Sequence, residues 1–442
     1  ILLIFSFAML GKVEAQSVLN PDDPIVVYNP ASPPATPPFG TLAKWVKTNR
    51  VGFNTTSFKA YFYKGIAFRL KFPKTYKDSL GTGKKYPLFV FFAGIGEKGT
   101  IYDNEYQLYH GGQTHMNAVD QGKFDGFLLY PQTSSSSGGW SDGQIYIIAD
   151  LIRTKLIGEV NVDPFRVSVN GLSGGGAAAW NMLKRHPTLV AASLPMSGTA
   201  IQHVSDVHNF PFNAYWISNG GLDRAPDPYT VNKVINAARN LGANYKHSFF
   251  PNLGHGVWNS FWALSDYFPY LVNANKLNPW SMFGRTEFCP SDPISATLGV
   301  TAGFDGYEWS RDGNLIPGAT SNSYVATSIG RYAVRIKIGT TWSNWSPKPV
   351  EIKHKGATIS PDIKPTDATS HVIPAPDGTT ELQLEVPEGY TSYNWQKEGS
   401  STVLSTNRFL TVSTAGAYKV RVTEQFGCSS EFSAPFFVVD AN

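Results

Sequence analysis

A serine set among glycines is the first point in the chain where chemistry can be inferred. The stretch Gly171-Leu-Ser173-Gly-Gly175 matches the pattern G-x-S-x-G. In that pattern the serine sits on a strained turn between a strand and a helix, and side chains in place of the two flanking glycines would collide. An alternating apolar run precedes the turn at 165–169, and small residues follow it at 176–179. This context predicts Ser173 as a nucleophile, in preference to a bystander serine in a glycine-rich turn.

A serine hydroxyl attacks a carbonyl group only when a base takes its proton, so a histidine held by an acid must accompany it. In hydrolases with this turn the acid and then the histidine follow the serine, each on a loop after a strand. Asp223 follows the apolar run 214–217 through a glycine loop, and His255 stands between two glycines after the run 245–250. The order predicts Asp223 as the acid and His255 as the base.

The same chemistry needs two backbone donors where negative charge develops on the substrate oxygen. One predicted donor is the amide of Gly174, directly after the serine. The other must come from the loop after the apolar run 88–92, which begins Ala93-Gly94-Ile95-Gly96. Glycines in this loop let the backbone approach a ligand closely. We predict the amide of Ile95 as the second donor, with Gly94 as the alternative.

Several other polar residues have simpler explanations. Asp227 precedes Pro228 at a predicted helix start and is interpreted as a helix cap. His203, Asp206 and His208 are close enough in sequence for a metal site, but no further ligand of matching type lies nearby. We therefore expect a polar loop there, and neither a metal nor a cofactor.

The residues just described must be positioned by a sheet. From residue 86 onward, continuous apolar runs alternate with helical stretches, which indicates a parallel sheet covered on both faces. The runs are 87–92, 127–130, 165–169, 191–195, 214–217 and 245–250, and the predicted helices are 142–157, 176–186, 229–241 and 257–273. Aromatic alternating runs at 58–62 and 66–72 predict an antiparallel edge. The fold class is therefore α/β, a doubly wound and mostly parallel sheet over 41–280, with short crossovers and a minimal lid.

A repeat follows this domain. Tyr307-Glu-Trp309 recurs as Tyr393-Asn-Trp395, and Gly330-Arg-Tyr332 recurs as Gly416-Ala-Tyr418, both with an offset of 86 residues. A central Trp and a later Tyr are typical of immunoglobulin-like sandwiches. We predict two all-β immunoglobulin-like domains, at 285–353 and 356–442, in preference to one elongated β domain.

Composition and the N-terminal segment indicate a globular secreted protein. The 442 residues are 42% hydrophobic and 16% charged with a net charge of +4, and no basic run suggests nucleic acid as a partner. Residues 1–15 are expected to be a partial signal peptide, too short to span a bilayer. The proline-rich residues 16–40 are predicted to be a linker or a surface strap. Because residue 1 is not Met, we expect the leader to be incomplete.

The chain has two cysteines, Cys289 and Cys428, which lie in different predicted domains. Two cysteines exclude a disulfide scaffold and a cysteine zinc site. A bridge between them stays open in an oxidising compartment, but the sequence favours two free thiols.

Several segments together resemble the secreted esterases of the α/β-hydrolase superfamily, within it the polyhydroxybutyrate depolymerase, feruloyl esterase and prolyl-oligopeptidase-like branch. The segments are 92–99, Tyr130-Pro-Gln132, 162–166, Ser197-Gly198 and the loops of Asp223 and His255, within 58–275. The sequence departs from the family at Ala93, where members usually carry histidine. The tail resembles paired immunoglobulin-like modules of large surface-secreted bacterial enzymes, in which a sorting domain often follows, so we expect further residues beyond this end.

Substrate contacts are predicted at four residues, Trp140, Gln132, His110 and Trp258. Trp140 follows a serine- and glycine-rich loop and is a candidate platform for substrate, although it is equally well explained as a tryptophan covering the core. His110 and His115 follow the first parallel strand, where they can line a pocket.

These observations predict a secreted or cell-surface bacterial serine esterase. The expected substrates are acetyl or feruloyl esters on plant polysaccharide, or a polyester, with polysaccharide contact through the immunoglobulin-like domains. One alternative is a serine peptidase of the prolyl-oligopeptidase-like branch, but the segment before the first strand is too short for the propeller that gates those enzymes. Another is a polysaccharide-binding surface protein with a hydrolase-fold scaffold, against which an intact triad argues.

Overall fold

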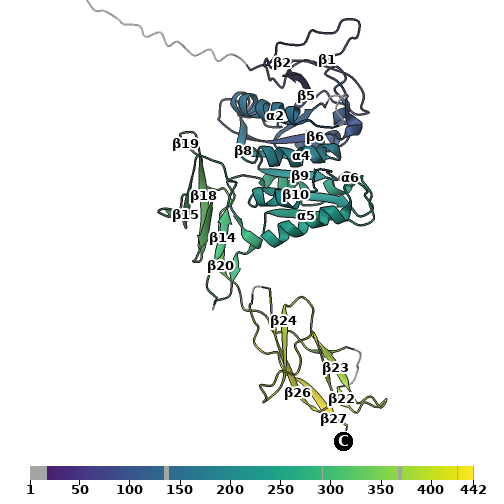
Figure 1. Cartoon of the computed structure of the whole chain (residues 1–442), viewed down its shortest axis with the longest axis vertical. Coiled ribbons are helices and arrows are strands. Elements are labelled where there is room, and N and C mark those ends of the chain that lie inside the picture. Colours follow the sequence, from purple (N-terminus) through teal and green to yellow (C-terminus); the bar gives the residue numbers. More distant parts are fainter. Residues whose placement is uncertain (1–16, 134–138, 291, 367–370, 426, 442) are drawn as a thin grey trace, which may run out of the picture. The chain divides into compact units, whose positions relative to one another are not determined.

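The computed structural model describes residues 17–133, 139–290, 292–366, 371–425 and 427–441 (Figure 1). The predicted signal peptide at 1–15 lies outside them. The chain forms two compact units. The first contains the described residues up to Gly284 with 297–324 and 332–350, and the second contains 285–296, 325–331 and 351–442.

The first unit is built on a nine-stranded sheet with the order β11-β10-β9-β8-β6-β7-β5-β4-β2. Six strands pair in parallel: β6 (Tyr86–Phe92), β7 (Phe127–Pro131), β8 (Val162–Leu172), β9 (Ala192–Met196), β10 (Ala214–Gly220) and β11 (Tyr245–Phe250). Three pair antiparallel at one edge: β2 (Ala43–Lys44), β4 (Phe58–Tyr63) and β5 (Ile66–Lys71). The predicted mostly parallel sheet with an antiparallel edge is confirmed.

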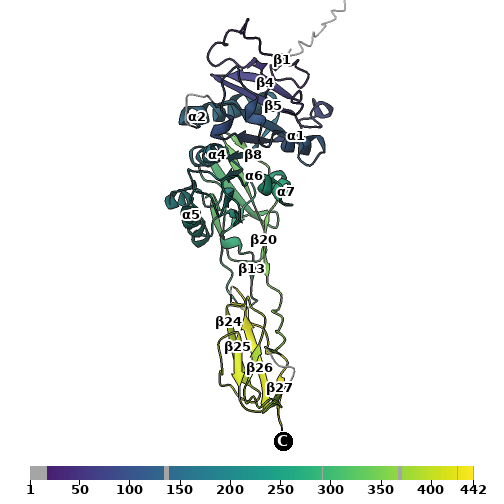
Figure 2. The ribbon, with the colours of Figure 1, turned by 90° about the vertical axis from the view of Figure 1, so that its right-hand side faces the viewer.

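Helices cover both faces of this sheet. They are α1 (Gly112–Asp120), α2 (Asp142–Leu151), α3 (Ile157–Glu159), α4 (Gly174–Arg185), α5 (Pro228–Leu241), α6 (Trp258–Trp262) and α7 (Tyr267–Asn273). Figure 2 shows α2, α4 and α5 on one side of the strands and α1 and α7 on the other.

The continuous apolar run of β6 explains this arrangement. Leu88, Val90 and Phe92 belong to the core cluster that α2, α4 and α5 complete, whereas Phe89 and Phe91 belong to the cluster that α1, α6 and α7 complete. Successive side chains of a strand point to opposite faces, so only a run apolar at every position can be buried on both.

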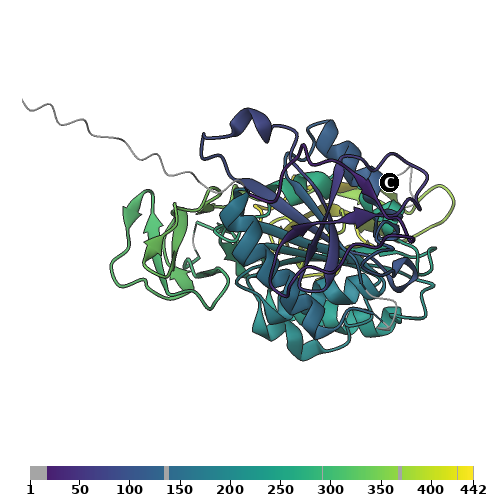
Figure 3. The same ribbon diagram turned by 90° about the horizontal axis from the view of Figure 1, so that it is seen from above.

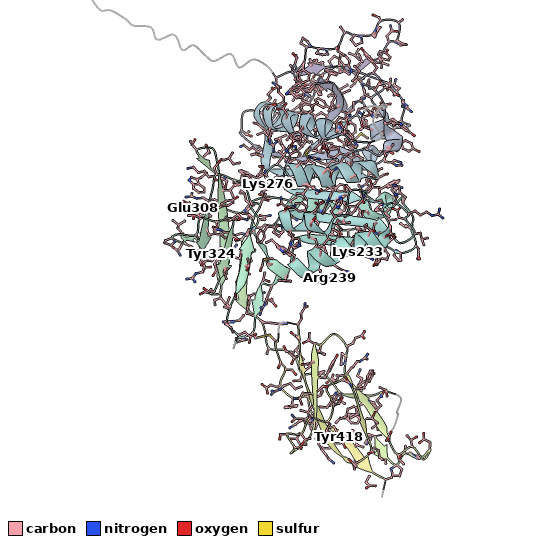
Figure 4. The ribbon with its side chains drawn as sticks, in the orientation of Figure 1. Lys233, Arg239, Lys276, Glu308, Tyr324 and Tyr418 are labelled. Carbon is pink, nitrogen blue, oxygen red and sulfur yellow. A yellow bond between two sulfur atoms is a disulfide. The ribbon has the colours of Figure 1, made fainter. Side chains whose placement is uncertain are left out.

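Helix α5 shows how the covering helices are built. Asp227 caps it through a 3.0 Å bond from the Thr230 amide, as predicted, and Pro228 occupies its first turn. Val231 and Val234 are buried against the sheet. The polar residues Lys233 and Arg239, labelled in Figure 4, are exposed on the same helix.

Two predicted helices differ from the observed ones. The stretch 142–157 forms α2, followed by a π-helical turn at Ile152–Leu156 and then α3. The stretch 257–273 forms two short helices, α6 and α7, in place of one. Pro269 explains the second break, because proline lacks the N–H that a continuous helix needs and is tolerated only in a first turn, where α7 places it.

The proline-rich segment forms a strap on the first unit. Its strand β1 (Val26–Val27) pairs in parallel with β3 (Val46–Lys47). Tyr28 stacks on Tyr102 with ring centroids 4.9 Å apart, and the Tyr102 hydroxyl donates to the Pro34 carbonyl over 3.0 Å. Figure 3 shows this N-terminal segment, in purple, crossing over one end of the unit.

After Arg285 the described residues form strands and no α-helix. Two further sheets are formed by β12 (Trp280–Ser281), which precedes Arg285, and by β13 (Glu287–Phe288), β14 (Ala296–Gly299), β15 (Gly306–Arg311), β16 (Asn314–Leu315), β17 (Ser323–Ala326), β18 (Gly330–Ile338), β19 (Thr341–Trp342) and β20 (Val350–His354). The remaining strands are β21 (Lys364–Pro365), β22 (Val372–Ile373), β23 (Leu382–Glu385), β24 (Ser392–Lys397), β25 (Phe409–Val412), β26 (Gly416–Thr423) and β27 (Phe436–Asp440).

The sequence repeat is also a structural repeat. Trp309 of β15 lies opposite Val334 of β18, and Trp395 of β24 lies opposite Val420 of β26. Both tryptophans are fully buried. Their indole N–H groups donate over 2.9 Å to the carbonyls of Ser321 and Asn407, respectively. The region is therefore strand-rich with two related cores.

Cys289 and Cys428 form a disulfide, so the expectation of two free thiols is wrong. The reason is topological. Residues 285–296 belong to the same compact unit as 351–442, which brings the two Cα atoms to 5.6 Å although 139 residues separate them in sequence. Among the residues that the structure describes, no helix is long and apolar enough to cross a bilayer.

Reduction of this disulfide should lower the free energy of unfolding of the second unit by about 3–5 kcal/mol, because the bridge closes a long loop in the unfolded chain. Urea unfolding with and without reductant, followed by hydrogen exchange at the amides of β24 and β26 in the second unit, measures the change. A Cys289→Ala, Cys428→Ala double variant is the control, since reductant should not affect it. An unchanged unfolding midpoint of the parent protein on reduction would contradict the prediction.

Candidate active site

Ser173 occupies a sharp turn between β8 and α4. Its backbone has φ 55° and ψ −121°, a conformation that costs a non-glycine residue roughly 1–3 kcal/mol. The turn is fixed on both sides, because the Ser173 amide donates to the Met196 carbonyl over 2.8 Å and the Ala177 amide donates to the Ser173 carbonyl over 3.0 Å. The strained residue is thus held by a strand and a helix that are themselves buried.

The glycines of the motif are required by close backbone contacts. A Cβ atom on Gly175 would lie 1.9 Å from the Phe92 carbonyl oxygen, and one on Gly171 would lie 2.1 Å from the Gly175 carbonyl oxygen. The turn therefore packs directly against the end of β6, as the pattern predicts.

The structure brings Ser173, His255 and Asp223 together in one hydrogen-bonded line. His255 Nε2 lies 2.8 Å from Ser173 Oγ, and His255 Nδ1 lies 2.9 Å from Asp223 Oδ2. Because β8, β10 and β11 run parallel in one sheet, the loops after them meet at the same edge. The side chain of His255 is 39% exposed and that of Asp223 is 3% exposed, so substrate can reach the imidazole but not the carboxylate.

Two further contacts fix these residues. Asp223 Oδ1 accepts from the Ala225 amide over 3.0 Å, which fixes the orientation of the carboxylate. The buried Ser197 hydroxyl donates to the His255 carbonyl oxygen over 2.8 Å. Ser197 itself has φ 46°, a second strained residue at the end of a central strand. The sequence indicated Ser197 only as part of a resembling segment, without this role.

Two backbone amides lie beside Ser173. Gly174 is the first residue of α4, and amides in the first turn of a helix have no acceptor within the helix and favour negative charge. The Ile95 nitrogen lies 3.7 Å from the position of a Cβ on Gly174, so the two predicted donors are neighbours. Gly94 is the residue before the short 3-10 turn Ile95–Glu97 and packs against Leu172.

Trp140 and Gln132 both donate hydrogen bonds to this loop. The Trp140 indole N–H donates to the Ala93 carbonyl over 2.9 Å, and its ring packs against the core below. The Gln132 amide donates to the Glu97 carbonyl over 3.0 Å, and its side chain is 4% exposed. Both residues were predicted to contact substrate, and the structure places both where they hold the loop in position.

His110 and Trp258 form a chain of ring contacts between this loop and His255. His110 Nε2 is 3.5 Å from Glu97 Oε1, its ring is 5.1 Å from the Trp258 ring, and the Trp258 ring is 6.1 Å from that of His255. Burial lowers the pKa of His110 and raises the pKa of Glu97. Glu97 was not predicted, since a glutamate in a glycine loop is ordinarily a surface residue.

His115 does not line a pocket. It is 1% exposed, with Nδ1 2.7 Å from the Tyr130 hydroxyl and Nε2 2.9 Å from the Tyr267 hydroxyl. Burial lowers the pKa of His115 to about 3, so the ring is neutral in the folded protein.

The polar loop of His203, Asp206 and His208 has structural contacts of its own. Asp206 is buried, accepts from the Trp180 indole over 3.1 Å and pairs with Lys184 at 2.7 Å. Over the described ranges of the chain, no group of three or more histidine, cysteine or acidic side chains is placed to hold a metal ion.

No family model and no curated protein matches the chain. Among solved structures it is similar to a thermostable esterase, with 25% identity, a TM-score of 0.45 and coverage of 50% of this chain and 63% of that one. It is also similar to a ferulic acid esterase, with 18% identity, a TM-score of 0.37 and coverage of 47% and 93%. It is similar as well to esterase 2 of Thermogutta terrifontis, with 14% identity, a TM-score of 0.38 and coverage of 47% of this chain and 88% of that one. The chain therefore spans less than two thirds of the first of these proteins.

Substitution Gly175→Ala should destabilise the protein by about 3 kcal/mol, because the new methyl group would collide with backbone that cannot move. Gly96→Ala is the matched control, since a Cβ at Gly96 meets nothing within 4 Å. Thermal unfolding of the two variants measures the difference. Equal melting temperatures for Gly175→Ala and Gly96→Ala would show that the close contact is not required.

The buried His115 should make stability depend on pH. Its pKa is about 3 when folded and about 6.5 when unfolded, so below pH 6.5 only the unfolded chain binds the proton. Stability is therefore lost as pH falls from 6.5 toward 3, by about 2 kcal/mol at pH 5. Urea unfolding at pH 7.5 and pH 5 measures this loss. The loss should shrink by that amount in His115→Gln, whose side chain does not titrate, and an identical loss in both proteins would rule out this assignment.

Proposed function

We propose that this chain is a serine carboxylic ester hydrolase. The observation that carries the proposal is the line of two hydrogen bonds, 2.8 Å and 2.9 Å long, from Ser173 through His255 to Asp223. The carboxylate can only accept, so Nδ1 of His255 carries the ring proton and Nε2 offers its lone pair to the serine hydroxyl. This is the tautomer that a general base needs.

In the proposed reaction, Ser173 Oγ attacks the ester carbonyl carbon while His255 Nε2 takes the hydroxyl proton. The carbonyl oxygen becomes negative and accepts hydrogen bonds from the amides of Gly174 and Ile95, each of which contributes about 2.7–4 kcal/mol in comparable sites. His255 then gives its proton to the leaving alcohol, and the acyl group stays on the serine. Water, activated by the same imidazole, releases the acid and restores the serine.

The proposed setting is the cell surface or the medium outside it. The disulfide between Cys289 and Cys428 supports this setting, since such bonds persist in oxidising compartments. We further propose that the strand-rich region forms two immunoglobulin-like domains, which the repeated buried Trp309 and Trp395 support. The proposed substrates are acyl esters on polysaccharide, or a polyester.

Ser173→Ala should lower the hydrolysis of p-nitrophenyl acetate by about 10³-fold or more, because the remaining donors alone cannot form an acyl-enzyme. Stopped assays of the purified variant measure the loss, and circular dichroism checks that the fold is kept. Activity within tenfold of the parent protein would overturn the proposal. A peptide p-nitroanilide in the same assay separates an esterase from a peptidase.

Asp223→Asn should lower kcat by about 10³–10⁴-fold, because an amide in place of the carboxylate favours the wrong imidazole tautomer. Asp227→Asn is the matched control, since asparagine caps helices as well as aspartate does and the residue lies outside the hydrogen-bonded line. Equal kcat values for the two variants would show that the buried carboxylate does not orient His255.

A further inference from the structure

Glu97 is a buried acid beside the proposed oxyanion donors. It ends the 3-10 turn that begins at Ile95, and it is 7% exposed. Among the described residues no lysine or arginine pairs with it, and its one ion-pair contact is His110, whose Nε2 lies 3.5 Å from Oε1. Burial lowers the pKa of His110, so its ring is neutral at neutral pH and does not balance a charge on Glu97. An acid buried with so little compensation is costly for folding, which indicates a role beyond packing.

The carboxyl group of Glu97 faces the backbone of its own loop. Its Oε2 atom is buried, lies 2.7 Å from the position of a Cβ on Gly94, and accepts from no side chain among the described residues. Burial raises the pKa of the carboxyl group above its ordinary value, and the amides of Gly94 and Glu97 oppose this rise. An amide has this effect when its N–H is directed at the carboxyl oxygens and stabilises their charge. The donors that serve Glu97 are therefore backbone amides of the loop.

Two peptide planes decide which amide of this loop can reach a substrate. In a planar trans peptide the C=O and the N–H point in opposite directions. The first plane joins Ala93 to Gly94. Its carbonyl accepts from Trp140 over 2.9 Å, and its N–H is directed at Glu97. The second plane joins Gly94 to Ile95, and its carbonyl accepts from the Glu97 amide over 3.2 Å, which turns the Ile95 N–H away from the interior of the turn.

The amide of Ile95 is thereby left for a substrate. Ile95 is the first residue of the 3-10 turn, where an amide has no acceptor within the turn. Its nitrogen lies 3.7 Å from the position of a Cβ on Gly174, which is the other proposed donor. The amide of Gly94, in contrast, is directed at an acid of the protein itself.

We infer that Glu97 is the positioning residue of the oxyanion loop: its carboxyl group orients the amide of Gly94 inward, so that Ile95 alone supplies the second donor. The inference rests on the proposed esterase function. It goes beyond that function because it assigns a role to a side chain outside the hydrogen-bonded line from Ser173 to Asp223, and because it decides between two candidate donors.

The donor is tested with Ile95→Pro, which removes the N–H. The backbone tolerates proline there, because Ile95 opens the turn and Gly94 before it is extended, with φ −71° and ψ 176°. We expect kcat for p-nitrophenyl acetate to fall about 10²–10³-fold with KM within about threefold, because the lost bond forms only in the transition state. Ile95→Val keeps the N–H and is the matched control, with kcat within about twofold of the parent protein.

The positioning role is tested with Glu97→Met and Glu97→Gln. Methionine fills the same space without an oxygen acceptor, whereas glutamine keeps an acceptor oxygen. We expect Glu97→Met to lower kcat about 10-fold with KM within about twofold, although its melting temperature is unchanged or higher, since an apolar group replaces a buried acid. Glu97→Gln should keep kcat within about threefold. Glu159→Met, at an exposed glutamate that ends α3, is the matched control and should change neither kcat nor KM.

A trifluoromethyl ketone gives a readout that does not depend on turnover. Ser173 Oγ adds to its carbonyl carbon, the hydroxyl proton passes to His255, and the carbonyl oxygen becomes an oxyanion that stays bound. Its inhibition constant should rise in Glu97→Met and in Ile95→Pro by the factor by which kcat falls, because the adduct resembles the transition state.

Three other outcomes overturn the inference and leave the esterase function intact. Equal kcat values for Ile95→Pro and Ile95→Val would show that Ile95 is not the donor. Equal kcat values for Glu97→Met and Glu159→Met would show that the buried acid does not orient the loop. A loss in Glu97→Met that Glu97→Gln shares in full would show that the acceptor oxygen is not what matters. A parent protein that cleaves no ester would overturn the proposed function itself.

Discussion

The site depends on one steric constraint, the contact between the backbone at Gly175 and the end of β6. A Cβ on Gly175 would lie 1.9 Å from the Phe92 oxygen, so only glycine lets the turn pack this closely against the sheet, and Ser173 within that turn has a positive φ. The strain persists because the strand and helix on either side are buried on the core. A serine held in this way cannot relax into the sheet, so its hydroxyl stays at the edge where the other loops meet.

The site also requires that the loops that carry Ile95 and His255 keep a fixed position. Trp140 and Gln132 donate to carbonyl oxygens of the loop that carries Ile95, and Ser197 donates to the carbonyl oxygen of His255. These bonds end on backbone carbonyl oxygens, so neither the amide of Ile95 nor the imidazole of His255 takes part in them. The chemistry proposed for this site thus needs a layer of buried donors that hold the loops in place.

Glu97 connects the loop of Ile95 to His110. Its carboxylate lies 2.7 Å from the position of a Cβ on Gly94 and 3.5 Å from His110, so one side chain contacts both the proposed oxyanion loop and the imidazole. A buried carboxylate with so few partners is costly, which is typical of functional sites and rare elsewhere.

The parallel sheet and the order of Ser173, Asp223 and His255 along it could be predicted from the sequence, because apolar runs and glycine turns are local properties of the chain. Which partner each of these side chains contacts is known only from the folded structure. Gln132 and Trp140 donate to carbonyl oxygens of a loop, His115 is buried between two tyrosines, and Cys289 bonds to Cys428 across 139 residues. Each of these depends on contacts between residues distant in sequence, and no periodicity or spacing records which distant partner a side chain will have.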